Sequence, residues 1–163
     1  MTTLALLVFL SQTPAPSLQL EGDLVKPSSF TAKDLAALST TNVEWSDKQG
    51  KHTATGVRLD TLLLERGFSE GAKGPAVNPK QKHPGLRAVV IATANDGFMA
   101  VFSVGELLGT LGTTNAVLIW EMDGKPLPPE FAPFRLVVTT DKAGSRSIYQ
   151  LAKLRVLDLA DKK

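Results

Sequence analysis

Short strand patterns separated by turn signals run the length of the chain and constrain its fold more than any other feature. Each pattern is an alternating or β-branched apolar run that ends near Gly, Pro, Asn or Asp, which predicts strands at 18–24, 43–45, 51–55, 86–94, 98–102, 116–122, 134–140 and 154–159. Capping-type sequences predict short helices within 31–38, 60–66 and 103–108. We therefore expect a single, mixed, β-rich α+β domain with short helices.

Three local expectations are specific enough to test. The run 86–94 has no polar alternation, so we expect that strand to be buried on both faces. Asp60 is the expected cap of the helix 60–66, and Gly67 its end. Residues 69–85 are rich in Gly, Pro, Lys and Asn without periodicity, which predicts a long loop.

Composition limits the chemistry that is open to this chain. Its 163 residues suit one domain, and with 43% hydrophobic residues the chain can form a core without disulfides or structural metal ions. The chain has no cysteine, which excludes thiolate nucleophiles, thiolate metal ligands and disulfides. A net charge of +2 is too small to indicate binding to nucleic acid or to an anionic membrane.

The amino terminus carries an unbroken apolar run at residues 4–10, followed by a polar stretch with two prolines. Seven residues are too few to cross a bilayer, which needs about 20, but they suit the core of a secretory signal peptide. We expect residues 1–17 to be a signal peptide cleaved between Ser11 and Ser17, and 18–163 to be a periplasmic or secreted domain without a membrane span. A frayed apolar terminus or a first strand is the alternative.

Catalytic and metal-binding patterns are absent from the sequence. The two histidines, His52 and His83, have no second ligand at helical spacing, so surface histidines are favoured over a metal site. No nucleophile elbow, S-x-x-K or phosphate-binding glycine loop occurs. Asp96 and Asp123 each precede Gly, which turn formation explains without chemistry. We therefore predict no catalytic residue and no metal ligand.

Basic residues offer two candidate anion sites. The segment 73–87 holds five basic side chains and no acid, which fits either an anion site or a solvated loop. Arg135 stands in an otherwise apolar strand pattern, and Lys142 and Arg146 follow it. These three could converge on one anion such as a phosphate, or Arg135 could pair internally while the other two are exposed.

Five segments carry motifs in order: L-x-L-x-G-D-L-V-K-P with F-T-x-x-D-L (18–35), G-V-R-L-D-T-L-L…G (56–67), A-N-D-G-F…F-S-V-x-E-L (94–107), D-G-K-P-L (123–127), and P-F-R-L-V-V…D-K…R (133–146). Together they resemble the oxidoreductase molybdopterin-binding domain family, which has the sulfite oxidase fold. The resemblance extends from about Leu18 to Leu157. Ala132, Phe98 and Thr139–Thr140 depart from the family pattern.

The resemblance implies a curled, mixed β domain that cradles a pterin cofactor. By position, Arg135, Lys142 and Arg146 would hold the pterin phosphate, and Asn95 and Asp96 would lie in the loop after a strand. In the family a cysteine thiolate, a soft ligand, binds the metal. This chain has no cysteine, so we expect no bound cofactor, although the resemblance leaves molybdopterin open.

Two functions from different classes remain at this stage. The chain is either an exported, non-catalytic module that binds a small anionic ligand or a partner protein, or a molybdopterin-dependent oxidoreductase or redox accessory subunit. In the second case the pterin alone, or a partner subunit, would complete the metal site. A third expectation is that Trp45, Trp120 and the Phe-rich strands fill the cofactor groove. The sequence names no substrate, redox partner or oligomeric state.

Overall fold

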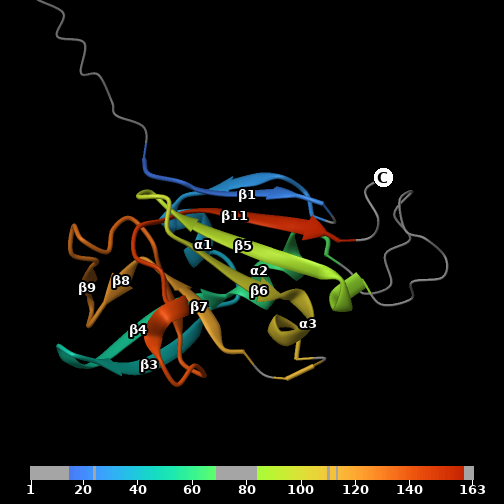
Figure 1. The fold of residues 1–163 in the computed structure, drawn as a ribbon. Helices are drawn as coiled ribbons and strands as arrows, with labels where there is room; N and C mark the ends of the chain where they lie inside the picture. The colour runs from blue at the N-terminus through green and yellow to red at the C-terminus, as the bar shows by residue number, and fades with distance from the viewer. Residues whose placement is uncertain (1–14, 24, 69–83, 110, 113, 160–163) are drawn as a thin grey trace, which may run out of the picture.

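The computed structural model of the chain describes residues 15–23, 25–68, 84–109, 111–112 and 114–159. Strands dominate the described chain and short helices lie between them, which confirms the predicted fold class (Figure 1). The strands are β1 (Leu18–Gly22), β2 (Ser28–Phe30), β3 (Thr41–Asp47), β4 (Gly50–Arg58), β5 (Ala88–Ala94), β6 (Met99–Ser103), β7 (Ala116–Ile119), β8 (Glu121–Met122), β9 (Lys125–Pro126), β10 (Arg135–Val138) and β11 (Leu151–Asp158). The helices are α1 (Ala32–Ala36), α2 (Leu59–Glu65) and α3 (Val104–Leu107), with 3-10 turns η1 (Pro84–Leu86) and η2 (Gly144–Arg146).

The strands form two main sheets and one small ladder. Sheet A has the order β2-β1-β11-β5-β6, sheet B the order β10-β7-β4-β3, and β8 pairs with β9. Among the described strands, β1 and β11 pair in parallel and the other pairs are antiparallel. The first and last described strands are therefore neighbours inside sheet A, whose edges are β2 and β6 (Figure 1).

Sheet B is buried on both faces at β7 and β10, whereas β3 and β4 are partly exposed. Leu136 and Val138 of β10 belong to the main core that sheet B shares with sheet A and the helices. Val137 points the other way, into a second, smaller cluster that Leu127 and Phe131 cover. All four residues of β10 are consequently buried. The face of sheet B that turns away from the main core, here called the outer face, is where Arg135 lies, because side chains alternate along a strand.

Strand β5 corrects the expectation of burial on both faces. Its residues alternate between buried and half-buried from Ala88 to Ala94, so only one face enters the core. Ala88, Val90 and Ala92 fill the core, while Val89 and Ile91 turn to the opposite side. The apolar run reflects β-branched residues on a partly exposed face as well as core residues.

The predicted helix starts are confirmed in two of three cases. Thr31 and Asp34 form a reciprocal capping box at α1, and Glu106 accepts a hydrogen bond from the Ser103 backbone at 2.9 Å before α3. The predicted cap of α2 is wrong, because Asp60 lies inside the helix. The residue at the N-cap position is Arg58, and its side chain makes no capping hydrogen bond. Asp60 instead binds the Arg58 guanidinium at 2.8 Å.

The turns also match the sequence with small corrections. Asp123 and Gly124 both have positive φ, as a tight β8–β9 hairpin requires. Pro126 nevertheless takes part in that short ladder, which the proline-rich sequence did not predict. The sequence patterns also did not predict β2 or the 3-10 turn η2. Most of the expected long loop, 69–83, lies outside the described residues.

Candidate functional site

Arg135 lies on the outer face of sheet B, and the chain itself holds its guanidinium through Nη1 and Nη2, while its buried Nε has no hydrogen-bond partner among the described residues. The residue is only 2% exposed. Its Nη2 donates to Asp47 Oδ2 at 3.3 Å, and its Nη1 approaches Met122 Sδ at 3.6 Å. The guanidinium carbon also stands 4.7–5.1 Å from the ring centres of three aromatic residues, Trp45, Phe131 and Tyr149. Arg135 is therefore a structural cation in an aromatic box.

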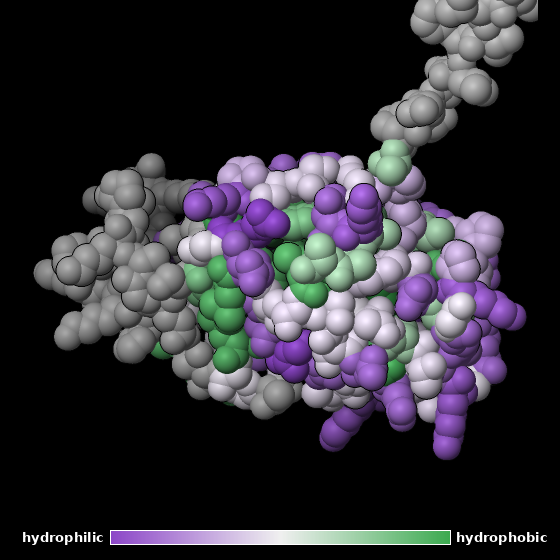
Figure 2. Space-filling view, turned by 180° about the vertical axis from the view of Figure 1, so that it is seen from behind, coloured by the Kyte–Doolittle hydropathy of each residue, from purple (hydrophilic) through white to green (hydrophobic). Residues whose placement is uncertain are grey.

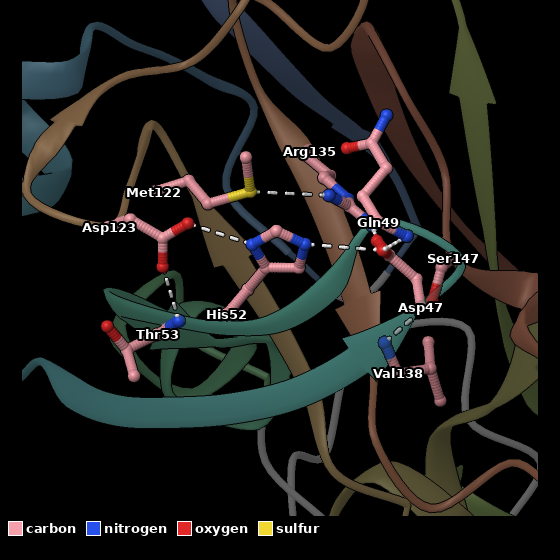
Figure 3. Close-up of polar contacts among 9 residues, drawn as sticks. All are labelled: Asp47, Gln49, His52, Thr53, Met122, Asp123, Arg135, Val138 and Ser147. Atoms are coloured by element: carbon pink, nitrogen blue, oxygen red, sulfur yellow. Dashed lines mark hydrogen bonds and ion pairs between the residues drawn. The ribbon is translucent and has the colours of Figure 1, made fainter.

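His52 extends this network toward the β8–β9 turn (Figure 3). Its Nδ1 lies 2.8 Å from Asp123 Oδ2, and its Nε2 lies 3.2 Å from Asp47 Oδ1. Asp123 also accepts a hydrogen bond from the Thr53 backbone at 2.8 Å. Because a carboxylate faces each ring nitrogen, only the doubly protonated imidazolium can donate to both. His52 thus joins the β3–β4 hairpin to the β8–β9 turn.

The electrostatics of this network favour its charged form. The hydrogen bond to Asp123 is the main cause of a raised His52 pKa, although burial opposes it. The pKa of Asp123 is lowered, first by His52 and then by the Thr53 backbone. Partial burial alone would raise the pKa of Asp47, but hydrogen bonds from the Gln49 backbone, Arg135 and His52 outweigh it and lower that pKa.

Arg146 is held by a separate pair of carboxylates. Its Nη2 and Nε bind Asp141 at 2.6 and 2.8 Å, and its Nη1 binds Glu106 Oε1 at 3.0 Å. Its guanidinium also stacks on Phe102, 4.8 Å from the ring centre. The hydrogen bonds to Asp141 raise the pKa of Arg146, and Arg146 lowers the pKa of Asp141. Asp141 thus occupies the pair of N–H donors, Nε and Nη2, with which Arg146 could bind a phosphate in a bidentate way.

The structure does not bring the predicted anion-binding residues together. Arg135 lies on the outer face of sheet B, whereas Arg146 contacts Phe102, a residue of the main core on the other side of that sheet. The two arginines do not meet at one place in this conformation, and their role in binding an anion stays a prediction. Arg135 pairs internally, as the alternative expected, but Arg146 is half-buried and paired as well rather than exposed. Lys142, which lies between the two arginines in the sequence and directly follows Asp141, is exposed.

The remaining predicted residues lie at the β5–β6 turn of sheet A. Asn95 and Asp96 are exposed there. The Asp96 carboxylate accepts a hydrogen bond from the Phe98 backbone at 2.9 Å, which is a turn-forming role. The backbone N–H of Asn95 donates to Gln150 O at 3.0 Å. The role of these two residues in cofactor binding stays a prediction.

Sequence reasoning missed the partners of Arg135 and His52. The predicted β3–β4 hairpin does imply that Trp45 faces His52, and the two rings are 5.4 Å apart. Asp47 and Arg135 are 88 residues apart, so no local pattern links them. Within the described part of the chain, no three His, Asp or Glu side chains gather as metal ligands. His83 lies outside the described residues.

Comparison with known proteins assigns the family. The model of the oxidoreductase molybdopterin-binding domain matches residues 12–163. The chain belongs to this family. Among solved structures, the sulfane dehydrogenase SoxCD from Paracoccus pantotrophus matches with a TM-score of 0.61 at 19% identity, over 91% of this chain and 39% of that one. The likeness shows a shared fold, and the chain spans well under half of that protein. A comparison with the curated proteins found no match.

The described residues do not fit the family's cofactor in the way that the motifs imply. Arg135 and Arg146, which match the family's positions for the pterin phosphate, already bind carboxylates of the chain. The whole sequence also lacks a cysteine, and therefore the thiolate that the metal would need. Releasing either guanidinium for a phosphate would leave partly buried carboxylates unpaired, which is costly.

Proposed function

We propose that this chain is an exported, non-catalytic member of the molybdopterin-binding family that binds a partner protein. The observation that carries this proposal is the internal neutralisation of Arg135 by Asp47 and of Arg146 by Asp141 and Glu106. A site with its cations already paired has little attraction for a pterin phosphate. Between an anionic ligand and a protein partner, this pairing favours the protein.

The lack of cysteine supports the same proposal, because the chain offers no thiolate ligand for the metal. A molybdenum centre that lost its thiolate would have to be held by the pterin alone. The apolar run at residues 4–10 supports export of the domain, in line with a signal peptide. Among the described residues, no helix is long and apolar enough to cross a membrane.

The experiment that tests this function measures the cofactor directly. The full chain is produced in a host that makes molybdopterin, and its molybdenum and extracted pterin are measured per chain. A cysteine-containing family member made in the same host is the positive control. We expect a folded chain with far less than one molybdenum and one pterin per chain. Stoichiometric molybdenum would overturn the proposal.

A molybdopterin-dependent oxidoreductase or redox accessory subunit is the second candidate, because the family match covers residues 12–163. In that case a partner subunit, or the pterin itself, would complete the metal site. Extracted pterin in the absence of metal would support this candidate, and so would molybdenum that is retained only when a partner is present. Loss of that pterin in Arg146→Ala, but not in Lys33→Ala on α1, would assign the phosphate site.

A further inference from the structure

The outer side of sheet A presents an apolar surface at its β6 edge. The β5–β6 register places six outward side chains in pairs: Val89 with Ser103, Ile91 with Val101, and Thr93 with Met99. None of them is charged. Met99 is 62% exposed and Val101 53%, and Phe98 at the adjoining turn is 50% exposed. We call the surface formed by Val89, Ile91, Phe98, Met99 and Val101 the β5–β6 face.

This face turns away from the helices that fill the core. In Figure 1, β11, β5 and β6 lie side by side with α1 and α2 behind them. Ala92 and Phe102, which point inward from the same two strands, belong to the main core together with Leu35 of α1 and Leu62 of α2. Figure 2 shows the opposite side of the molecule, seen from behind, where hydrophobic areas also lie between hydrophilic ones, and not the β5–β6 face. Exposed large apolar residues that gather on one sheet edge indicate an interaction site.

The β6 edge lacks the usual protection of an edge strand. β6 is the last strand of sheet A, and neither it nor β5 contains a charged residue or a proline. Natural edge strands commonly carry lysine, proline or bulges that block association. The backbone N–H of Ala94 donates to Phe98 O at 2.9 Å, so Ala94 and Phe98 form a hydrogen-bonded pair, and every second pair along the two strands does the same. Met99 and Val101 therefore direct their backbone groups away from β5.

Arg155 borders the apolar surface with an exposed cation. In the β11–β5 register Arg155 is the neighbour of Ile91, which in turn pairs with Val101, and on its other side Arg155 pairs with Glu21 of β1, so the four form one row across the sheet. Arg155 is exposed, and among the described residues no carboxylate forms an ion pair with it. Its neighbour two positions earlier, Lys153, differs in this respect because it binds Glu21 at 3.4 Å.

We propose that the β5–β6 face is the docking surface for a partner protein whose apolar side chains are flanked by a carboxylate opposite Arg155. This inference rests on the proposed function and names the surface through which it acts. A second copy of the chain fits less well, because β5 and β6 offer no carboxylate to Arg155, and the carboxylate in its row, Glu21, already binds Lys153. An apolar centre with arginine at its border is the composition of protein–protein interfaces.

The experiment places a photo-crosslinking amino acid at Val101 of the full chain, made in its native cells. Leu64 on α2, 54% exposed against 53% for Val101, is the matched control position. We expect Val101, but not Leu64, to give an adduct with one other protein. The cross-linked peptide should carry Asp or Glu beside apolar residues. Arg155→Glu should reduce that adduct by about tenfold, whereas Arg155→Lys should retain most of it.

Other outcomes overturn the inference. These are adducts in equal yield from Val101 and Leu64, an adduct with a second copy of this chain, no adduct at Val101, or an adduct that Arg155→Glu leaves unchanged. Restoration of the Arg155→Glu adduct by a carboxylate-to-lysine change in the identified partner would support it further. The molybdenum content of the same preparation tests the proposed function separately. A metal-free chain without an adduct refutes the docking surface alone, and a metal-loaded chain with one refutes only the non-catalytic role.

Discussion

Arg135 shows how this fold accommodates a buried charge without a ligand. Asp47 supplies the opposite charge, and the faces of three aromatic rings replace much of the lost hydration. The same arginine, by its place in the family motif, was expected to hold a phosphate. Its partners come from four separate segments of the chain, so the sequence around Arg135 could not show that the charge was already paired.

Replacement of Arg135 should therefore affect stability rather than ligand binding. We expect Arg135→Met to lower the free energy of unfolding by about 2 kcal/mol or more, because it leaves Asp47 without its cation. The loss should be below the ~3–5 kcal/mol of a fully buried pair, since the Asp47 side chain is 25% exposed. Urea denaturation measures the change. Lys142→Met, an exposed control, should shift the free energy by about 0.5 kcal/mol or less. Equal effects of the two substitutions would contradict the structural role.

His52 should make the stability depend on pH. Its pKa is raised above the unfolded value of 6.5, so the folded state holds the proton more tightly. The stabilisation is complete below about pH 6.5 and is lost as the pH rises through the folded pKa. The lowered pKa values of Asp47 and Asp123 act oppositely, and their stabilisation is lost as the pH falls below about 3.8.

Denaturation curves of the wild type and of His52→Gln between pH 5 and pH 9 measure this dependence. The wild type should lose stability across the upper half of that range. The glutamine variant, which has no proton to release there, should change much less. Parallel curves for the two proteins would show that the Asp47–His52–Asp123 network does not carry a proton.

At the scale of elements, caps and turns are where the sequence was most informative. The capping boxes at Thr31 and Ser103, the Asp123–Gly124 turn and the β3–β4 hairpin all depend on contacts within a few residues. Asp60 was misassigned as a cap because a carboxylate at a helix start satisfies the same pattern when it lies one position inside. The pairing Arg58–Asp60 is equally local but has no distinctive motif.

The close approach of β4 and β7 makes Gly56 a second element-scale test. A Cβ at Gly56 would meet Leu118 O at 2.5 Å and Val117 Cγ1 at 2.7 Å, so the two strands would have to separate. We expect Gly56→Ala to destabilise the fold by about 1–3 kcal/mol. Gly144→Ala is the matched control, because no atom lies within 4 Å of the added Cβ. Thermal melts that fall equally for both variants would contradict the packing described.

At the scale of the whole molecule, the motifs predicted the family and the fold class but not the state of the site. The motifs identify the fold, but they do not show which side chains pair with the arginines of the site. Whether an arginine of the motif is free to bind a ligand depends on which carboxylates the fold brings to it. Here those carboxylates come from β3, α3 and the segment before η2. The burial of β5 differs from the expectation for a related reason: an apolar run does not reveal which of its two faces enters the core.

Native mass spectrometry of the chain isolated from the cells that make it shows whether the folded protein carries molybdopterin. The folded protein should have the mass of its polypeptide alone, shortened by a leader that ends between Ser11 and Ser17. The same ion after denaturation should lose nothing. A folded species that carries the additional mass of one molybdopterin, released on denaturation, would contradict the account.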